Sequence, residues 1–154
     1  MFRGNHPAKV EESGRLKLPT AFKDLIEGAG ITQFYVTSVD GKSAEIWPIG
    51  EWEKREAQLL AFSTMNPTVK KYLNKTGYYG QQLKMDGQGR LVLPQILREA
   101  AALEGDVIVI GRISYLEVFN RAKYEETVMS DDLTEVDLNT IAQMLEQPKQ
   151  AGDR

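Results

Sequence analysis

The chain has 154 residues, of which 42% are hydrophobic and 27% are charged, an ordinary composition for one compact domain. It contains no cysteine, so disulfides and thiolate-bound metal are excluded. No run of eighteen apolar residues occurs, and residues 1–7 lack the apolar segment of a secretory signal. These features predict a cytoplasmic protein without a membrane span.

The formal net charge of −3 is unevenly distributed. Residues 125–154 hold eight acids and two bases, a balance of −6, so residues 1–124 hold seventeen bases and fourteen acids, a balance of +3. This mildly basic body permits binding to nucleic acid but does not by itself predict it, because phosphate binding depends on where the bases cluster.

The first predicted elements belong to a motif that occurs twice. Residues 9–19 read KVEESGRLKLP, and residues 84–94 read KMDGQGRLVLP. Each copy predicts a short strand, a turn made at the glycine, a second strand with its leucines on the buried face, and a helix that begins near the proline. We expect these helices to end at Gly28 and near Gly105.

The two copies remain similar after these helices. Strand-like runs at 34–37 and 106–110 are followed by loops and then by strand-like runs at 44–47 and 116–119. Trp52 and Tyr124 occupy matching places beyond them. A unit of about forty-five residues buries too little surface to be stable alone, so the two copies are expected to stack or interlock.

Further helices are predicted between and after the copies. Residues 52–62 have an amphipathic pattern, and Asn66-Pro67 predicts the cap and first turn of a short helix. Residues 131–146 predict a C-terminal helix whose apolar positions are Leu138, Ile141, Ala142 and Leu145, followed by a polar, frayed end. The fold class is mainly β with flanking short helices (α+β), and the predicted segments are repeats at 5–50 and 81–124, a helical connector at 51–80 and an acidic helix and tail at 125–154.

The Gly-Arg turns carry the candidate functional side chains. In a purely structural interpretation each turn holds an exposed ion pair, which contributes only about 0 to 1 kcal/mol and is a weak reason to repeat the arrangement. In a functional interpretation, Glu11 and Asp86 orient Arg15 and Arg90 so that each guanidinium can bind phosphate or a guanine edge. Further bases lie near both turns, namely Lys9, Lys84 and Lys17. Spacing alone leaves both interpretations open.

The sequence argues against an enzyme. His6 is the only histidine, and neither a metal-ligand cluster nor a phosphate-binding or nucleophile motif is present. We therefore predict no catalytic residue, metal, cofactor or small-molecule substrate. The aromatic residues are expected to pack in the core or at a subunit interface rather than to stack on bases, and those considered are Trp47, Trp52, Tyr72, Tyr78, Tyr79 and Phe119.

Several of these segments together resemble the MraZ family, bacterial regulators of the SpoVT/AbrB-like swapped-hairpin class. The resemblance rests on MFRG at 1–4, the two Gly-Arg motifs, WP at 47–48 with EWE at 51–53, and LREAA at 97–101, and it spans roughly residues 1–145. It implies two AbrB-like halves that interlock in one pseudo-two-fold, barrel-like domain. It also implies a ring-shaped homo-oligomer.

The same resemblance implies a transcriptional regulator, with repression as the expected effect. Its expected target is the division and cell-wall gene cluster, including its own promoter, where it would bind short direct repeats of double-stranded DNA in the nucleoid. The DNA contacts would come from Glu11 with Arg15 and from Asp86 with Arg90, with Lys9, Lys84, Lys17 and Arg3 as further candidates. In the first copy, Glu11 stands where the family usually has aspartate, and Ser13 stands where lysine is common.

A second hypothesis comes from the antitoxin-type relatives of this fold. In it, the chain is an oligomeric module that organises a protein partner and does not recognise DNA by itself.

Overall fold

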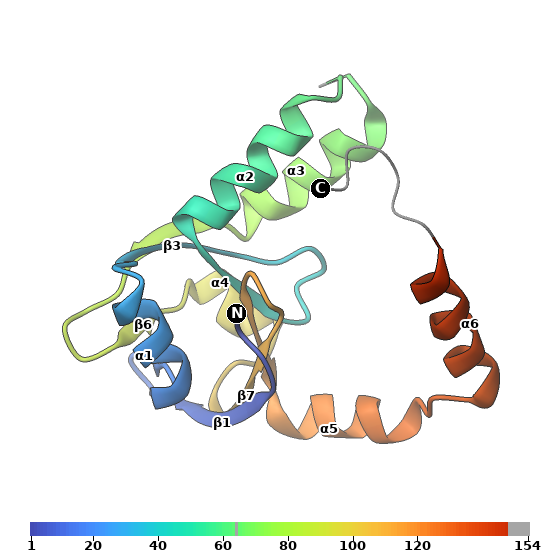
Figure 1. Cartoon of the computed structure of the whole chain (residues 1–154). Coiled ribbons are helices and arrows are strands. Elements are labelled where there is room, and N and C mark those ends of the chain that lie inside the picture. Colours follow the sequence, from blue (N-terminus) through green and yellow to red (C-terminus); the bar gives the residue numbers. More distant parts are fainter. Residues whose placement is uncertain (64, 148–154) are drawn as a thin grey trace. The chain divides into compact units, whose positions relative to one another are not determined.

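The computed structural model describes residues 1–63 and 65–147 (Figure 1). The chain divides into two compact units, Met1–Tyr124 and Glu125–Arg154. The first unit contains an antiparallel sheet of eight strands, and the described residues also form six short helices. The predicted α+β fold class is therefore confirmed.

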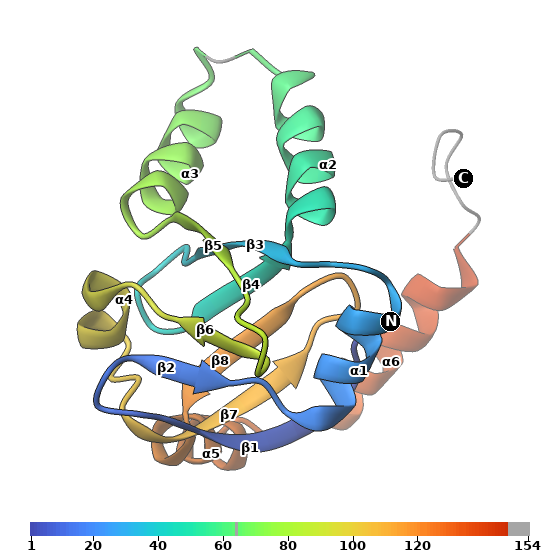
Figure 2. The same ribbon diagram turned by 90° about the vertical axis from the view of Figure 1, so that its left-hand side faces the viewer.

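The sheet curls into a nearly closed barrel (Figure 2). Its strand order is β5-β3-β4-β8-β7-β1-β2-β6, and the two outermost strands, β5 and β6, lie next to each other. The strands are β1 (Asn5–Val10), β2 (Arg15–Lys17), β3 (Gln33–Thr37), β4 (Ala44–Pro48), β5 (Gln81–Lys84), β6 (Arg90–Val92), β7 (Gly105–Gly111) and β8 (Leu116–Asn120). Closure leaves little unpaired strand edge exposed to other chains.

Strands from residues 5–50 pair extensively with strands from residues 81–124. β1 pairs with β7, β3 with β5, β2 with β6 and β4 with β8. The backbone N–H of Leu18 donates to the carbonyl of Gly89 at 3.0 Å, and that of Leu93 donates to Gly14 at 2.9 Å. These are the pairings that interlocked copies require, and the exact segment limits 5–50, 51–80, 81–124 and 125–154 stay a prediction.

The barrel interior is formed by the residues that alternate inward along the strands. Leu16, Leu18, Leu91 and Leu93 are buried, whereas Arg15 and Lys17 are exposed. The predicted two-residue alternation is thus confirmed. Burial of each leucine contributes about 1.5 to 3 kcal/mol relative to exposure, so the inner face fixes the register and thereby which side chains point outward.

Two helices follow the Gly-Arg motifs as predicted. α1 (Thr20–Gly28) begins directly after Pro19, and α4 (Gln95–Ala100) begins directly after Pro94. The prediction that the second helix ends near Gly105 is wrong, because the backbone leaves the helical region at Ala102, where φ is 52°. Gly105 instead begins β7.

α2 (Ile49–Leu60) and α3 (Pro67–Tyr78) form a helical hairpin that projects from the barrel (Figure 2). α2 begins three residues before the predicted start at Trp52, immediately after Pro48. The predicted cap of α3 is confirmed, because the Asn66 side chain accepts hydrogen bonds from the backbone N–H groups of Thr68 and Val69.

The aromatic residues mostly pack within the first unit. Trp47 and Trp52 are 4% exposed; Trp47 stacks on Tyr115 with ring centroids 4.1 Å apart, and Trp52 stacks on Tyr35. The expected packing role is confirmed for these two tryptophans. Tyr78, by contrast, is exposed in the single chain.

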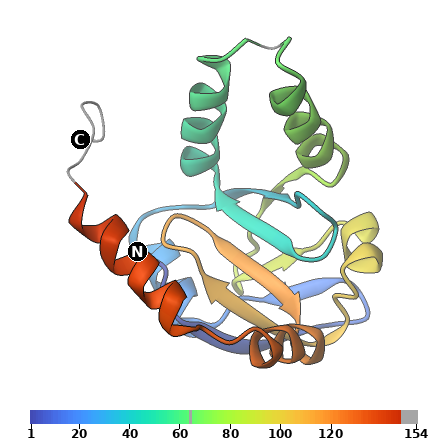
Figure 3. The same ribbon diagram turned by 90° about the vertical axis from the view of Figure 1, so that its right-hand side faces the viewer.

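The chain continues through α5 (Arg121–Ser130) into α6 (Glu135–Glu146), drawn in orange and red in Figure 3. α5 was not predicted, because it has no buried residue and no clear apolar face. The predicted start of the last helix was four residues too early, since Thr134 and Asp137 form a capping box that starts α6 at Glu135. The predicted frayed end lies almost entirely outside the described residues. Among the helices that the structure describes, none is long and apolar enough to cross a membrane.

Candidate nucleic-acid interface

The two Gly-Arg turns close with the same backbone geometry. In the first, Gly14 N–H donates to the carbonyl of Glu11 at 2.8 Å, and Glu11 N–H donates to Arg15. The second repeats both bonds with Gly89, Asp86 and Arg90. Both glycines have positive φ, +85° and +75°, a conformation that favours glycine. The predicted turns are therefore present.

In the second turn, Asp86 holds Arg90 in place. Its Oδ2 accepts from Arg90 Nε at 2.9 Å, while its Oδ1 accepts from the backbone N–H groups of Arg90 at 2.9 Å and Gln88 at 2.8 Å. These donors, chiefly the backbone N–H of Arg90, lower the pKa of the Asp86 carboxyl below its usual value. A charged carboxylate fixed at both oxygens therefore orients the guanidinium, as predicted.

The first turn lacks this arrangement. Oε2 of Glu11 accepts from the Ser13 hydroxyl at 3.4 Å, and no ion pair joins Glu11 to Arg15 in the described part of the chain. The expectation that Glu11 orients Arg15 is wrong for this structure. Asp86 is one methylene shorter, so its carboxylate can accept from N–H groups of its own turn as an Asx-turn does, whereas the longer glutamate extends past them.

The outer face of the β2–β6 pair carries three cations. The register places Lys17 directly opposite Arg90 and Arg15 opposite Val92, while Leu16 and Leu91 face the core between them. Like charges directly opposite on antiparallel strands destabilise a sheet by about 0.2 to 1 kcal/mol. Asp86 offsets part of the charge of Arg90, and the exposed Arg15 and Lys17 beside it leave this face positively charged, which suits an anion such as phosphate.

Two further bases lie against the turns and were not among the predicted site residues. A side chain at Gly14 would meet the guanidinium of Arg98 at 2.6 Å, and one at Gly89 would meet the Lys23 side chain at 2.7 Å. Lys23 and Arg98 occupy the same position in the two copies. The occurrence of a base at this position in both copies is the sequence signal that could have identified Lys23 and Arg98.

The remaining candidate bases are less closely grouped. Lys9 lies opposite Asp106 on β7, and Lys84 ends β5 opposite Gln33. Arg3 precedes β1 and therefore lies at the other end of that strand from the first turn, roughly 20 Å away at about 3.3 Å per residue. The structure thus brings Arg15, Lys17 and Arg90 together and leaves Arg3 apart.

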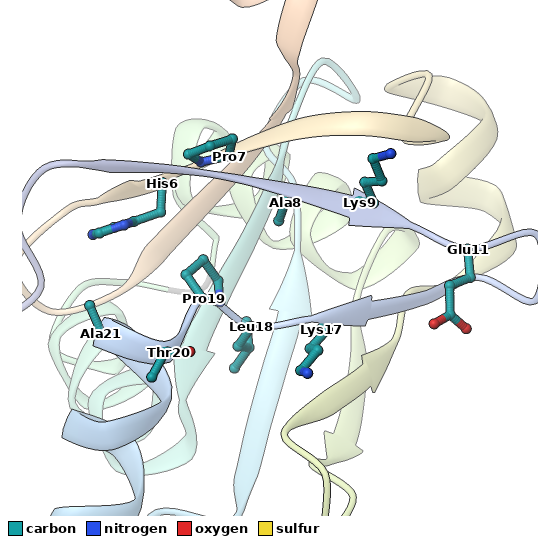
Figure 4. Close-up of a pocket in the computed structure, with 10 residues that line it drawn as sticks. All are labelled: His6, Pro7, Ala8, Lys9, Glu11, Lys17, Leu18, Pro19, Thr20 and Ala21. Carbon is teal, nitrogen blue, oxygen red and sulfur yellow. The ribbon is translucent and has the colours of Figure 1, made fainter.

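A cleft opens where β1 and β2 separate beyond their single paired position, Val10 with Leu16. It has a volume of about 730 Å³ and is lined by residues of β1, β2 and the start of α1 (Figure 4). Lys9 and Lys17 come from its two sides, but in this view their ammonium groups point away from each other. His6, at the other end, packs edge-on against Phe22 with ring centroids 4.9 Å apart.

A second charged cluster lies where β4 pairs with β8. Glu45 and Glu117 are directly opposite each other. Trp47 Nε1 donates to Glu45 at 2.8 Å, and Arg112 Nε donates to Glu117 at 2.9 Å. Burial raises the pKa of Glu45, and the indole donor partly opposes that effect. Because both acids already have protein partners, this cluster is structural.

No group of three or more metal-ligating side chains occurs among the described residues.

Comparison with known proteins places these features in a family. Residues 1–75 and 80–144 match the family model described as "MraZ protein, putative antitoxin-like". A protein of Acidobacterium capsulatum is 50% identical over 143 residues, covering 93% of this chain and 98% of the relative. One of Koribacter versatilis is 46% identical over 94% of this chain and 99% of its own, and one of Thiobacillus denitrificans is 34% identical over 83% and 86%. All three are named transcriptional regulator MraZ.

Proposed function

The chain therefore belongs to the MraZ family, and we propose that it is a transcriptional regulator that binds promoter DNA through the outer face of β2–β6. The relatives' names are those of regulators and not of enzymes. The observation that carries the proposal is that Lys17 and Arg90 lie directly opposite each other on this outer face with Arg15 exposed beside them, a cluster of bases that suits DNA phosphate.

The dimensions of this face suit DNA. A three-residue strand is about 10 Å long, and a two-stranded ribbon fits the major groove, which is about 12 Å wide. Arg90, already oriented by Asp86, is suited to two-pronged contact with a guanine edge or a phosphate. Arg15 and Lys17 are exposed and supply phosphate contacts beside it.

One mildly basic subunit offers few phosphate contacts, so assembly is part of the proposal. A ring of identical copies would present neighbouring β2–β6 faces to direct repeats upstream of the protein's own operon. Linking sites in this way raises apparent affinity by about 10² to 10⁴ without a new type of contact. The proposal includes repression of the division and cell-wall gene cluster and association with the nucleoid.

The test is substitution of each arginine by alanine. Arg15→Ala and Arg90→Ala should each weaken binding to the upstream DNA in gel-shift titrations, while size-exclusion chromatography and melting temperature stay unchanged. Lys42→Ala, at an exposed lysine in the β3–β4 connection, is the control for loss of one positive charge. Unchanged DNA affinity in both arginine variants would reject this face as the DNA-binding site.

The family description "antitoxin-like" favours one alternative, an oligomeric module that binds a protein partner. Retention on a promoter fragment that falls with rising salt supports direct DNA binding. Failure to bind that DNA, combined with pull-down of a specific protein, would support the module instead.

A further inference from the structure

The two Gly-Arg turns differ in what their backbone N–H groups bind. In the second turn, one carboxylate oxygen, Oδ1 of Asp86, accepts from the N–H groups of Gln88 at 2.8 Å and Arg90 at 2.9 Å. The residues at the same places in the first turn are Ser13 and Arg15. Among the described residues, neither of these two N–H groups has a hydrogen-bond acceptor. The first turn therefore leaves open a pair of donors that the second turn fills with its own anion.

The backbone of the first turn has the shape that the second turn uses to hold that anion. In both, the glycine N–H donates to the carbonyl three residues earlier, at 2.8 Å for Gly14 and 3.1 Å for Gly89, and the glycine φ is positive. Successive N–H groups in such a turn form a concave anion-binding site, called a nest. The position of Asp86 Oδ1 shows that one anionic oxygen can bind both N–H groups of this turn.

Two arginine side chains lie beside the open turn. Arg15 is exposed, and a side chain at Gly14 would meet Cζ of Arg98, which comes from the second copy, at 2.6 Å. Nε of Arg98 donates to the carbonyl of Leu93 at 3.0 Å, so the guanidinium is held against the turn. In the described part of the chain Arg98 forms no ion pair. Its charge is therefore available to an anion bound at the first turn.

Two acids also belong to the first turn. Glu11 and Glu12 are exposed, and the Glu11 carboxylate accepts from the Ser13 hydroxyl at 3.4 Å. Three bases against two acids leave a local net charge of +1, and these bases are Arg15, Lys17 and Arg98. An exposed glutamate can rotate away from a bound anion, whereas the backbone N–H groups are fixed by the turn. The open pair of donors is thus compatible with an incoming phosphate.

We propose that the first Gly-Arg turn is a phosphate site, in which the N–H groups of Ser13 and Arg15 bind one oxygen of a DNA phosphate and the Arg98 guanidinium contacts the same phosphate. Hydrogen bonds from backbone N–H groups to an anionic oxygen are among the stronger ones in proteins. The second turn is already filled by Asp86, so its role is to hold Arg90. The inference rests on the proposed function and deepens it, because it separates a turn that binds phosphate from a turn that positions a side chain.

A scan of the DNA phosphates tests this site. Each phosphate of a single operator repeat is replaced in turn by an uncharged methylphosphonate, and affinity is measured by gel-shift titration. The wild-type protein should lose about tenfold at one position, because a hydrogen bond to a charged group is worth about tenfold or more in affinity. Glu11→Asp places a carboxylate at the length of Asp86 in the first turn. This variant should bind the unmodified repeat more weakly and should lose little at that position.

Two further variants separate filling of the nest from other effects. Glu11→Gln keeps the length of glutamate without its charge, so it is the matched control and should retain the wild-type scan. Arg98→Ala should reduce the loss at the same phosphate, whereas Lys42→Ala should not. Size-exclusion chromatography and melting temperature check that each variant is folded and assembled.

Each outcome of the scan bears on a different statement. The same profile for wild type and Glu11→Asp overturns the inference and leaves DNA binding by the β2–β6 face intact. Failure of the wild-type protein to bind the upstream DNA overturns the proposed function and the inference with it. Inorganic phosphate is the second probe. If it raises the melting temperature of the wild type more than chloride does at equal ionic strength while the scan stays flat, the turn binds a free anion and the assignment to DNA phosphate is wrong.

Discussion

Replacing Lys17 by valine should make the free protein more stable and its DNA complex weaker. Valine is the residue that occupies the equivalent position in the second copy, Val92. The substitution removes the like charge directly opposite Arg90 in the β2–β6 pair. Such a pair costs about 0.2 to 1 kcal/mol, and Asp86 offsets part of that cost here. For a chain of this size the melting temperature should rise by between about half a degree and 4 °C.

The effect on DNA binding has the opposite sign. Loss of one phosphate contact per subunit lowers the slope of log affinity against log salt by about 0.9, so the advantage of the wild-type subunit over the variant should shrink about 3.5-fold when salt rises fourfold. Scanning fluorimetry measures the first effect, and gel-shift titration of a single operator repeat at two salt concentrations measures the second.

The converse substitution and a distant lysine complete this test. Val92→Lys places a cation opposite Arg15, so it should lower the melting temperature and steepen the salt dependence by a similar amount. Lys42→Val removes the same charge outside the strand pair and should change DNA affinity little. If Lys17→Val lowers stability and leaves promoter affinity unchanged, Lys17 is a structural residue and the phosphate-binding role of this face is refuted.

Two further predictions concern the acids. Glu11→Asp should let residue 11 accept hydrogen bonds from backbone N–H groups of its own turn, as Asp86 does. One net hydrogen bond contributes about 0.5 to 1.5 kcal/mol, so the melting temperature should rise. No increase would show that side-chain length is not the reason for the difference between the turns. Glu45 has a raised pKa in the folded state, so the stability linked to its protonated form is complete below its unfolded pKa of about 4.3 and is lost as pH rises through the folded value. Glu45→Gln lacks that loss, so its melting temperature relative to wild type should increase from pH 4 to pH 7, and a constant difference across that range would contradict the argument.

The sequence predicted most of the barrel because its signals there are local. The alternation of Leu16 and Leu18, the glycines of the turns and the cap at Asn66 each act within a few residues, and all appear as expected. α5 could not be predicted in this way, because its residues have no apolar periodicity. The end of α4 was also missed, since it depends on Ala102 adopting a positive φ that alanine rarely takes.

The candidate site was predictable in its members but not in its geometry. Repetition of the motif identifies Arg15 and Arg90, yet only strand pairing reveals that Lys17 faces Arg90 and that Arg3 lies apart. The failure of Glu11 to hold Arg15 depends on one methylene group and on where the turn directs its N–H groups. Lys23 and Arg98 were missed because their contacts with the turns join the two copies.

The differences between the two copies bear on the kind of DNA site that the proposed function requires. A face with exact two-fold symmetry would match a palindrome, as symmetric dimers do. At one end of the β2–β6 face, Lys17 lies opposite Arg90, whose guanidinium is held by Asp86. At the other end, Val92 lies opposite Arg15, which makes no ion pair with Glu11 in the described part of the chain. The two ends of the β2–β6 face therefore differ, and the face would have a defined direction on bound DNA. Head-to-tail assembly would give every subunit the same direction around a ring, which is the arrangement that direct repeats require and inverted repeats do not.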